Sequence, residues 1–314
     1  MFIVLGCGTF LWGFAVWTLL PDSISKAKFL SEEERQFASN RAAVSGTGAT
    51  EKTTWRWGQV VECLTDPKTW LIFGLELCTQ IPNGGTQNFA NLVIVSFGFT
   101  NLQSTLLTIP YSLIAVATIT GTGWLAGRFR QLNCLLIVGV VLPCVVGSAI
   151  IYSRAHIVLN VQLFGYFLLS TGPAAMPLAM SLVQANYRGV TKKMTVTAML
   201  FLAYCAGNIS GPHFFLSEEA PTYDTAFRTI MICYALTVIL ALALRFYLQW
   251  TNARRVRLEG FEGSAGNAGA VGGKGLDAAR DSTNVADIVD RVPLVSDDYE
   301  DVTDWNTPGF RYRY

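Results

Sequence analysis

The sequence is poor in charge. Only 14% of its 314 residues are Asp, Glu, Lys or Arg, whereas a typical soluble domain carries about 25%. Hydrophobic residues make up 51% of the chain, and long stretches contain no charge at all. Such stretches need helices that satisfy their own backbone hydrogen bonds away from water. The formal net charge of +1 gives no indication of a nucleic-acid partner.

Histidine is scarce as well, with only His156 and His213. The seven cysteines form no CxxC pair and no cluster with histidine, so we expect no metal site. The sequence also holds no nucleophile–base arrangement and no phosphate-binding loop. We therefore expect neither an enzyme nor a bound cofactor.

Long apolar segments are what the chain does have. A bilayer-spanning helix needs about 20 mostly apolar residues. Seven segments meet this length: 2–20, 69–95, 104–127, 132–152, 156–180, 194–216 and 227–250. The sequence therefore predicts an all-α integral membrane protein with seven transmembrane helices in contact with the lipid bilayer.

The links between these segments alternate in basic charge. Lys and Arg are frequent in the links 21–68, 128–131 and 186–193 and just after Trp250, and they are scarce in 96–103, 153–155 and 217–226. Basic links of membrane proteins lie in the cytoplasm. We therefore predict a multi-pass protein with its N-terminus outside and its C-terminus in the cytoplasm.

Two parts of the chain lie outside the apolar segments. In the link 21–68, Ser31 followed by three glutamates predicts a capped surface helix, and Trp55 to Asp66 is amphipathic and suited to the headgroup boundary. The tail after Trp250 becomes rich in Gly, Ala and Asp. We expect this tail, 251–314, to be disordered.

Helix-breaking residues interrupt two of the segments. Segment 69–95 contains Pro82, Gly84 and Gly85, and segment 156–180 contains Gly172 and Pro173. Breakers at corresponding positions of two inverted three-helix repeats, here 69–152 and 156–250, indicate a transporter site. Alternatively, these residues only permit close helix packing or a kink.

Segment 69–95 also carries a stripe of polar residues. Its members follow one another at helical spacings of 4, 3, 4 and 4: Glu76, Gln80, Asn83, Gln87 and Asn91. They therefore share one helix face. Glu76 should face the bundle interior or a water-filled path, because a carboxylate facing lipid is costly. It is a candidate for proton coupling, or alternatively a structural hydrogen-bond partner.

Two further polar groups accompany this stripe. Tyr204 and Asn208 share a face of segment 194–216, and Ser170 and Thr171 lie in segment 156–180. Polar groups within a membrane bundle need a partner, either a neighbouring helix or a substrate. The predicted substrate-binding residues are therefore Gln80, Asn83, Gln87, Ser170, Thr171, Tyr204 and Asn208.

Several stretches of the chain match a known pattern: Leu20-Pro21-Asp22-Ser23 to Arg35, Trp55-Arg56-Trp57 to Trp70, Gly123-Trp124-Leu125-Ala126-Gly127-Arg128, Thr191-Lys192-Lys193, Tyr204 to Pro212, and Asp301-Val302-Thr303-Asp304 to Tyr312. Together they resemble the fungal allantoate permease-like branch of the anion:cation symporters, within the major facilitator superfamily. The resemblance covers nearly the whole chain. Gly127 departs from the pattern, because an acidic residue is usual there.

The resemblance implies that the seven segments are helices six to twelve of a twelve-helix fold. On this basis 1–20 is equivalent to helix 6, 21–68 is the central loop and 69–250 is the six-helix C-terminal half. It implies plasma-membrane uptake of a small organic anion such as allantoate, ureidosuccinate, nicotinate or pantothenate, by proton symport and alternating access. The chain would then be truncated at its N-terminus and would need the missing helices or a partner chain.

Two other interpretations stay open at this point. A transporter-derived nutrient sensor or an inactive fragment would keep the same helices without transport. A seven-helix receptor would share the predicted topology, but no membrane segment holds an internal lysine for a retinal Schiff base. The breakers, which follow a three-plus-three repeat, favour the transporter.

Overall fold

The structure is a computed structural model. It describes residues 2–21, 24, 27, 29–44, 54–96, 98–129, 131–153, 157–220, 222–265, 301–307 and 310–314. Within these ranges the side chains at 39–44, 90–93, 96, 101 and 258–265 are not described. The chain divides into two units, and each is treated separately. The first comprises Met1–Trp55, Arg188–Val190 and Ala268–Gly309, and the second comprises Arg56–Tyr187, Thr191–Asn267 and Phe310–Tyr314.

The first unit contains two long helices, α1 (Phe2–Leu19) and α2 (Glu32–Val44). The cap predicted at Ser31 is present. The Glu34 backbone N–H donates to Ser31 Oγ (3.3 Å), and the Ser31 N–H donates to Glu34 Oε2 (2.9 Å). These reciprocal bonds satisfy two backbone donors that an N-terminus otherwise leaves without partners.

The second unit is a bundle of helices. Its elements in chain order are α3 (Trp57–Thr65), α4 (Pro67–Ser96), α5 (Asn101–Arg128), α6 (Asn133–Tyr152), α7 (Leu159–Leu169), the 3₁₀ turn η4 (Gly172–Ala174), α8 (Ala175–Asn186), α9 (Val190–Ser210), the 3₁₀ turns η5 (Gly211–Phe214) and η6 (Ser217–Glu219), and α10 (Asp224–Ala265). The α3 helix is amphipathic, as predicted. Its Val61 and Leu64 are exposed, whereas its Cys63 is buried. Burial raises the pKa of the Cys63 thiol.

Within the described residues, six helical stretches are long and apolar enough to cross a bilayer: Phe2–Leu19, Leu102–Arg128, Asn133–Tyr152, Leu159–Asn186, Val190–Phe214 and Asp224–Arg257. The chain is thus an all-helical membrane protein. The segment predicted at 69–95 is helical throughout as part of α4, yet it is not among the six. Its polar stripe lowers its hydropathy, which agrees with a helix whose polar face meets protein rather than lipid.

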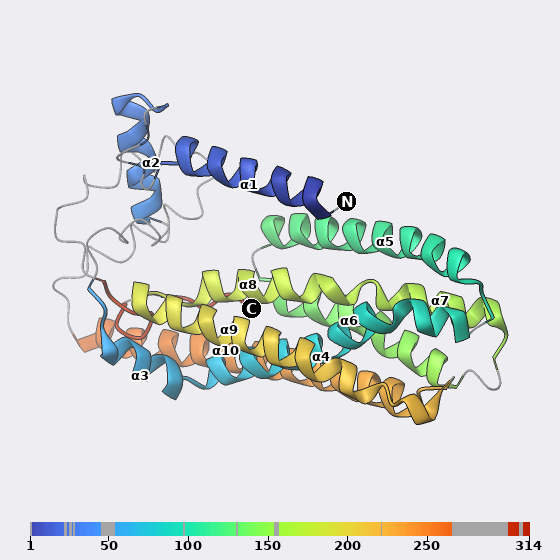
Figure 1. Cartoon of the computed structure of the whole chain (residues 1–314). Helices are drawn as coiled ribbons and strands as arrows, with labels where there is room; N and C mark the ends of the chain where they lie inside the picture. The colour runs from blue at the N-terminus through green and yellow to red at the C-terminus, as the bar shows by residue number, and fades with distance from the viewer. Residues whose placement is uncertain are drawn as a thin grey trace. The chain divides into compact units, whose positions relative to one another are not determined.

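The core of the bundle lies where α10 packs against α6 and α4 and where α6 packs against α7 (Figure 1). Ile137 and Val141 of α6 and Leu244 of α10 are completely buried there. Small residues determine how closely α6 and α7 pack. A Cβ on Gly147 would lie 2.5 Å from the Gly165 carbonyl oxygen, so only glycine allows this crossing.

The sequence predicts a disordered tail over 251–314. In the described residues, α10 continues to Ala265, and Phe310–Tyr314 has defined contacts with the bundle. Phe310 and Tyr312 are 5% and 4% exposed. The prediction was based on the average composition of the tail. The stretches 251–265 and 310–314 differ from that average, because they contain aromatic and basic side chains.

Candidate functional site

The predicted polar stripe forms a row of hydrogen bonds along α4. Gln87 Nε2 donates to Asn83 Oδ1 (3.5 Å), Asn83 Nδ2 to Gln80 Oε1 (3.1 Å) and Gln80 Nε2 to Glu76 Oε1 (2.9 Å). Every amide in the row points its donor toward Glu76. The side chain of Asn91, the last predicted member, lies outside the described residues. The row thus ends on the carboxyl group of Glu76.

The row runs from the surface of the unit into its interior. Gln87 is exposed, Asn83 is half-buried, Gln80 is 4% exposed and Glu76 is fully buried. The second carboxyl oxygen of Glu76, Oε2, has no hydrogen-bond partner among the described residues. A buried polar atom without a partner is uncommon and calls for a proton, a water molecule or a ligand. Glu76 therefore has one oxygen available to bind a proton or a donor group.

The α9 helix joins the row through Asn208. Asn208 Nδ2 donates to Gln80 Oε1 (3.1 Å) and to the Tyr204 carbonyl oxygen (2.9 Å), while Asn208 Oδ1 accepts from Asn83 Nδ2 (3.3 Å). We call the set of Glu76, Gln80, Asn83, Gln87 and Asn208 the α4–α9 network. Four of the seven predicted substrate-binding residues thus lie together, and Tyr204 takes part through its backbone.

Glycines bring the two helices into backbone contact at this network. A Cβ on Gly84 would lie 2.7 Å from Asn208 Cα, and one on Gly207 would lie 2.5 Å from Gln80 Cβ. At the start of η5, a Cβ on Gly211 would lie 2.4 Å from the Ile81 carbonyl oxygen. Real side chains essentially never come this close, so the close approach that lets Asn208 reach Gln80 requires glycine.

The structure corrects the break predicted at Pro82, Gly84 and Gly85, because α4 is continuous from Pro67 to Ser96 with Pro82 inside it. A proline removes a single helix hydrogen bond, and neighbouring helices in a membrane bundle tolerate this. Gly84 and Gly85 serve packing instead: a Cβ on Gly85 would lie 2.7 Å from the Phe215 ring. The alternative that these residues permit close packing describes α4 correctly.

The other predicted interruption has a different structure. Between α7 and α8 the chain forms the 3₁₀ turn η4, which begins with Gly172 and Pro173. A Cβ on Gly172 would lie 2.8 Å from Tyr234 Oη of α10. Nearby, Ser170 Oγ donates to the Phe167 carbonyl (2.6 Å), and Thr171 Oγ1 donates to the Val140 carbonyl of α6 (2.6 Å). The Thr171 bond holds the turn against α6. Among the described residues, no hydrogen bond joins Ser170 or Thr171 to the α4–α9 network.

A buried ionic cluster was not anticipated from the sequence. Lys68 Nζ lies 3.0 Å from Asp66 Oδ2, and Lys192 Nζ lies 3.4 Å from the same oxygen and 2.7 Å from Glu62 Oε1. Both lysines and Asp66 are at most 1% exposed. We call these four residues the Lys68 cluster. It joins α3 and the start of α4 to the start of α9.

The hydroxyl of Tyr187 extends this cluster. Its oxygen lies 2.9 Å from Thr69 Oγ1, and its ring lies 4.5 Å from Lys68 Nζ. The sequence did carry one signal, because Asp66-Pro67-Lys68 and Thr191-Lys192-Lys193 both fall within the stretches of family resemblance. Asp66 and Lys192 are 126 residues apart. The local sequence around each residue does not indicate that these two stretches come together.

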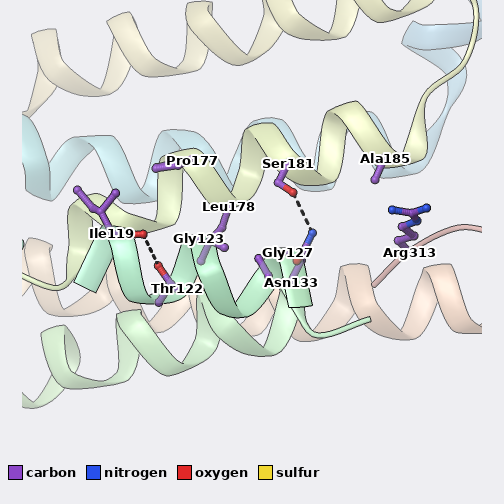
Figure 2. A pocket seen from close by; sticks show the side chains of 11 residues that line it. Ile119, Thr122, Gly123, Gly127, Asn133, Pro177, Leu178, Ser181, Ala185 and Arg313 are labelled. Carbon is purple, nitrogen blue, oxygen red and sulfur yellow. Dashed lines mark hydrogen bonds between the residues drawn. The ribbon is translucent and has the colours of Figure 1, made fainter. Parts of the chain in front are cut away.

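A pocket of about 300 Å³ lies between α5, α8 and the start of α6 (Figure 2). Its lining is mostly small and apolar, with Thr122, Asn133, Ser181 and Arg313 as polar members. Asn133 Nδ2 donates to Ser181 Oγ (3.2 Å), while Asn133 Oδ1 has no hydrogen-bond partner in the described part of the chain. The lining contains none of the predicted substrate-binding residues. Gly127, where the related pattern has an acidic residue, forms part of it.

Comparison with known proteins finds fungal transporters. An MFS-type transporter of Penicillium expansum is 32% identical over 255 residues, which are 81% of this chain and 53% of the relative. An uncharacterized transporter of Schizosaccharomyces pombe is 28% identical over 312 residues, covering 99% and 56% of the two chains. The allantoate permease of Saccharomyces cerevisiae is 25% identical over 328 residues, covering 99% and 54%.

No protein-family model matches the chain, and no solved structure matches it. The chain spans about half the length of the curated relatives that it matches. The similarity extends over most or all of this chain and agrees with its apolar helices. The chain is therefore an all-helical membrane protein related to the allantoate permease-like transporters of the major facilitator superfamily.

Proposed function

We propose that the chain forms one half of a transporter that moves a small organic anion together with a proton. The α4–α9 network carries this proposal, because it combines amides that can bind carboxylate or ureido groups with a buried carboxyl group. Allantoate, ureidosuccinate, nicotinate and pantothenate all have the size and polarity for such a site. The name of the permease among its relatives supports this class of substrate.

The proposed arrangement follows the twelve-helix fold of the family. In it, α1 is equivalent to helix 6, the residues up to Lys68 form a central cytoplasmic loop, and α4 to α10 form the C-terminal half. The chain lies in the plasma membrane with its C-terminus in the cytoplasm. Basic links on one side of the membrane support this orientation. The other half of the central cavity comes from the preceding helices or from a partner chain.

In this proposal Glu76 is the proton site. Its Oε1 is held by Gln80, and its Oε2 is the atom that receives the proton. A buried carboxyl group without a cation beside it is far easier to keep neutral than charged. Because the amide row leads from exposed Gln87 to Glu76, binding of a substrate to these amides would change the hydrogen bonds of the carboxyl group. This coupling links substrate and proton.

The test is uptake of labelled allantoate, ureidosuccinate, nicotinate and pantothenate in yeast cells that lack their own permeases for these compounds. One strain expresses this chain alone, and a second expresses it behind the first five helices of a relative. We expect uptake only in the second strain, with loss on changing Asn208→Ala. Correct membrane insertion without uptake in either strain would contradict the proposal and would favour a transporter-derived sensor or an inactive fragment.

A further inference from the structure

The segment Phe310–Tyr314, called here the tail segment, is held by two asparagine side chains. Asn252 Nδ2 donates to the Tyr312 carbonyl oxygen (2.8 Å), and Asn252 Oδ1 accepts from the Tyr312 N–H (2.9 Å). Asn186 does the same for the next residue: its Nδ2 donates to the Arg313 carbonyl (2.8 Å) and its Oδ1 accepts from the Arg313 N–H (2.6 Å). Both polar backbone groups of two successive residues are therefore satisfied.

These bonds fix the path of the tail segment. In an extended chain, the backbone groups of successive residues point to opposite edges. Asn252 belongs to α10 and Asn186 ends α8, so the segment lies between these two helices with one edge toward each. Each asparagine amide takes the place of a neighbouring β-strand. Such pairing resembles the way that peptide-binding proteins recognise an extended ligand through its backbone.

Side chains of the tail segment fill specific places on the bundle. The ring of Tyr312 lies 4.3 Å from Lys68 Nζ, on which Tyr187 also packs at 4.5 Å. The Lys68 ammonium group therefore lies over the rings of both Tyr187 and Tyr312, which is a favourable cation–π arrangement. Arg255 Nη2 donates to Tyr312 Oη (3.0 Å), and Arg255 Nη1 donates to the Phe310 carbonyl (3.2 Å).

We propose that the ends of α4 and α8, together with α10 around Asn252, form a peptide-binding cleft whose ligand is the tail segment of the same chain. Occupancy of this cleft holds the three helices together, because Lys68 belongs to α4, Asn186 to α8 and Asn252 to α10. In this proposal the tail segment is an exchangeable ligand, although its Phe310 and Tyr312 pack into the hydrophobic core of the bundle. This inference is independent of the proposed transport activity.

Binding within one chain is favoured by the length of the connection. Phe310 lies 45 residues after Ala265, the last residue of α10. The return path from Ala265 to Asn252 is 13 helical residues, or about 20 Å at ~1.5 Å per residue. At about 3.3 Å per residue, the maximum length of this connection is several times the distance that it has to span. A tethered ligand also has a millimolar-range effective concentration, which a second chain cannot match when dilute.

Hydrogen exchange of the intact chain in lipid nanodiscs, read by mass spectrometry on a fragment covering 310–314, tests the proposal. The amides of Tyr312 and Arg313 donate to asparagine side chains, so we expect exchange at least about tenfold slower than in an unstructured peptide of the same sequence. Asn252→Ala and Tyr312→Ala should each abolish most of this protection. Asn160→Ala, at an exposed asparagine of α7, is the matched control and should not change it.

Tyr312→Ala changes only the ligand, so it keeps the test valid if Asn252→Ala disturbs the bundle. A synthetic peptide Phe-Arg-Tyr-Arg-Tyr added in excess should compete and restore fast exchange of the tail segment. Absence of protection in the unaltered chain would overturn the proposal. Protection that disappears on dilution to one chain per nanodisc would show exchange between chains and would overturn binding within one chain.

Discussion

Gly84 of α4 and Asn208 of α9 meet at their backbones, since a Cβ on Gly84 would lie 2.7 Å from both the Cα and the carbonyl oxygen of Asn208. Neither atom belongs to a flexible side chain that could move aside. Gly84→Ala should therefore push the helices apart, at a cost of about 1–3 kcal/mol typical of overpacking. The measurement is thermal unfolding of the purified chain in detergent.

The control for this change is Gly121→Ala on α5. No atom lies within 4 Å of a Cβ at that position. Replacing an unhindered helical glycine by alanine typically stabilises by roughly 0.5–1 kcal/mol. We expect the midpoint of thermal unfolding to fall for Gly84→Ala and to stay unchanged or rise for Gly121→Ala. Equal effects of the two substitutions would argue against close contact between α4 and α9.

The carboxyl group of Glu76 gives a second prediction. Glu76→Gln keeps an acceptor for Gln80 Nε2 but removes the ability to bind and release a proton. In cells that also supply the first half of a relative, we expect uptake to lose its dependence on external pH. Glu218→Gln, at an exposed glutamate of the link before α10, serves as the control and should leave that dependence intact. Unaltered pH dependence in Glu76→Gln would exclude Glu76 as the coupling residue.

The Lys68 cluster gives a third prediction, for stability. Asp66 is 1% exposed and lies within 4 Å of two buried lysines. Asp66→Asn leaves both ammonium groups without this partner, and breaking a buried pair typically costs about 3–5 kcal/mol. A fall of roughly 6–20 °C in the unfolding midpoint follows for a domain of this size. The pair Glu32–Arg35, in which the glutamate side chain is 77% exposed, is the comparison, because Glu32→Gln should change the midpoint little.

The link before α10 gives a prediction that concerns pH. The side-chain hydroxyl and backbone N–H of Thr225 both donate to the Glu219 carboxylate and lower its pKa below the ordinary value. Because the folded pKa lies below the unfolded one, this contribution to stability is present above the ordinary carboxyl range and is lost as pH falls through the depressed pKa. Thr225→Val should raise the Glu219 pKa, as measured by NMR titration of labelled glutamate. An unchanged pKa would show that the hydroxyl contributes nothing.

Local pattern was enough to predict much of this chain. The apolar segments became helices, the Ser31 cap formed, and the spacing of Glu76, Gln80, Asn83 and Gln87 placed them in one hydrogen-bonded row. These features depend on residues within one or two turns of each other. The effect of Pro82 was misjudged, because whether a proline breaks a helix depends on what packs beside it.

Contacts between distant segments could not be predicted in the same way. Asn208 and Asn83 are 125 residues apart, and Asn186 and Arg313 are 127 apart. A single sequence does not indicate which asparagine binds which distant segment, because an asparagine at a helix end could equally well cap that helix. The Lys68 cluster was missed for a related reason. Lysine next to a loop is usually solvated, and only the packing of α3 and α9 buries it.

The length of α10 has a consequence for where the tail segment lies. The hydrocarbon layer of a bilayer is about 30 Å thick. Asn252 is 28 residues beyond Asp224, or about 42 Å along the axis at ~1.5 Å per residue. If Asp224 marks one boundary of that layer, Asn252 stands beyond the other. The tail segment would then bind at the level of the lipid headgroups, where its basic side chains Arg311 and Arg313 are close to the phosphate groups of the lipids.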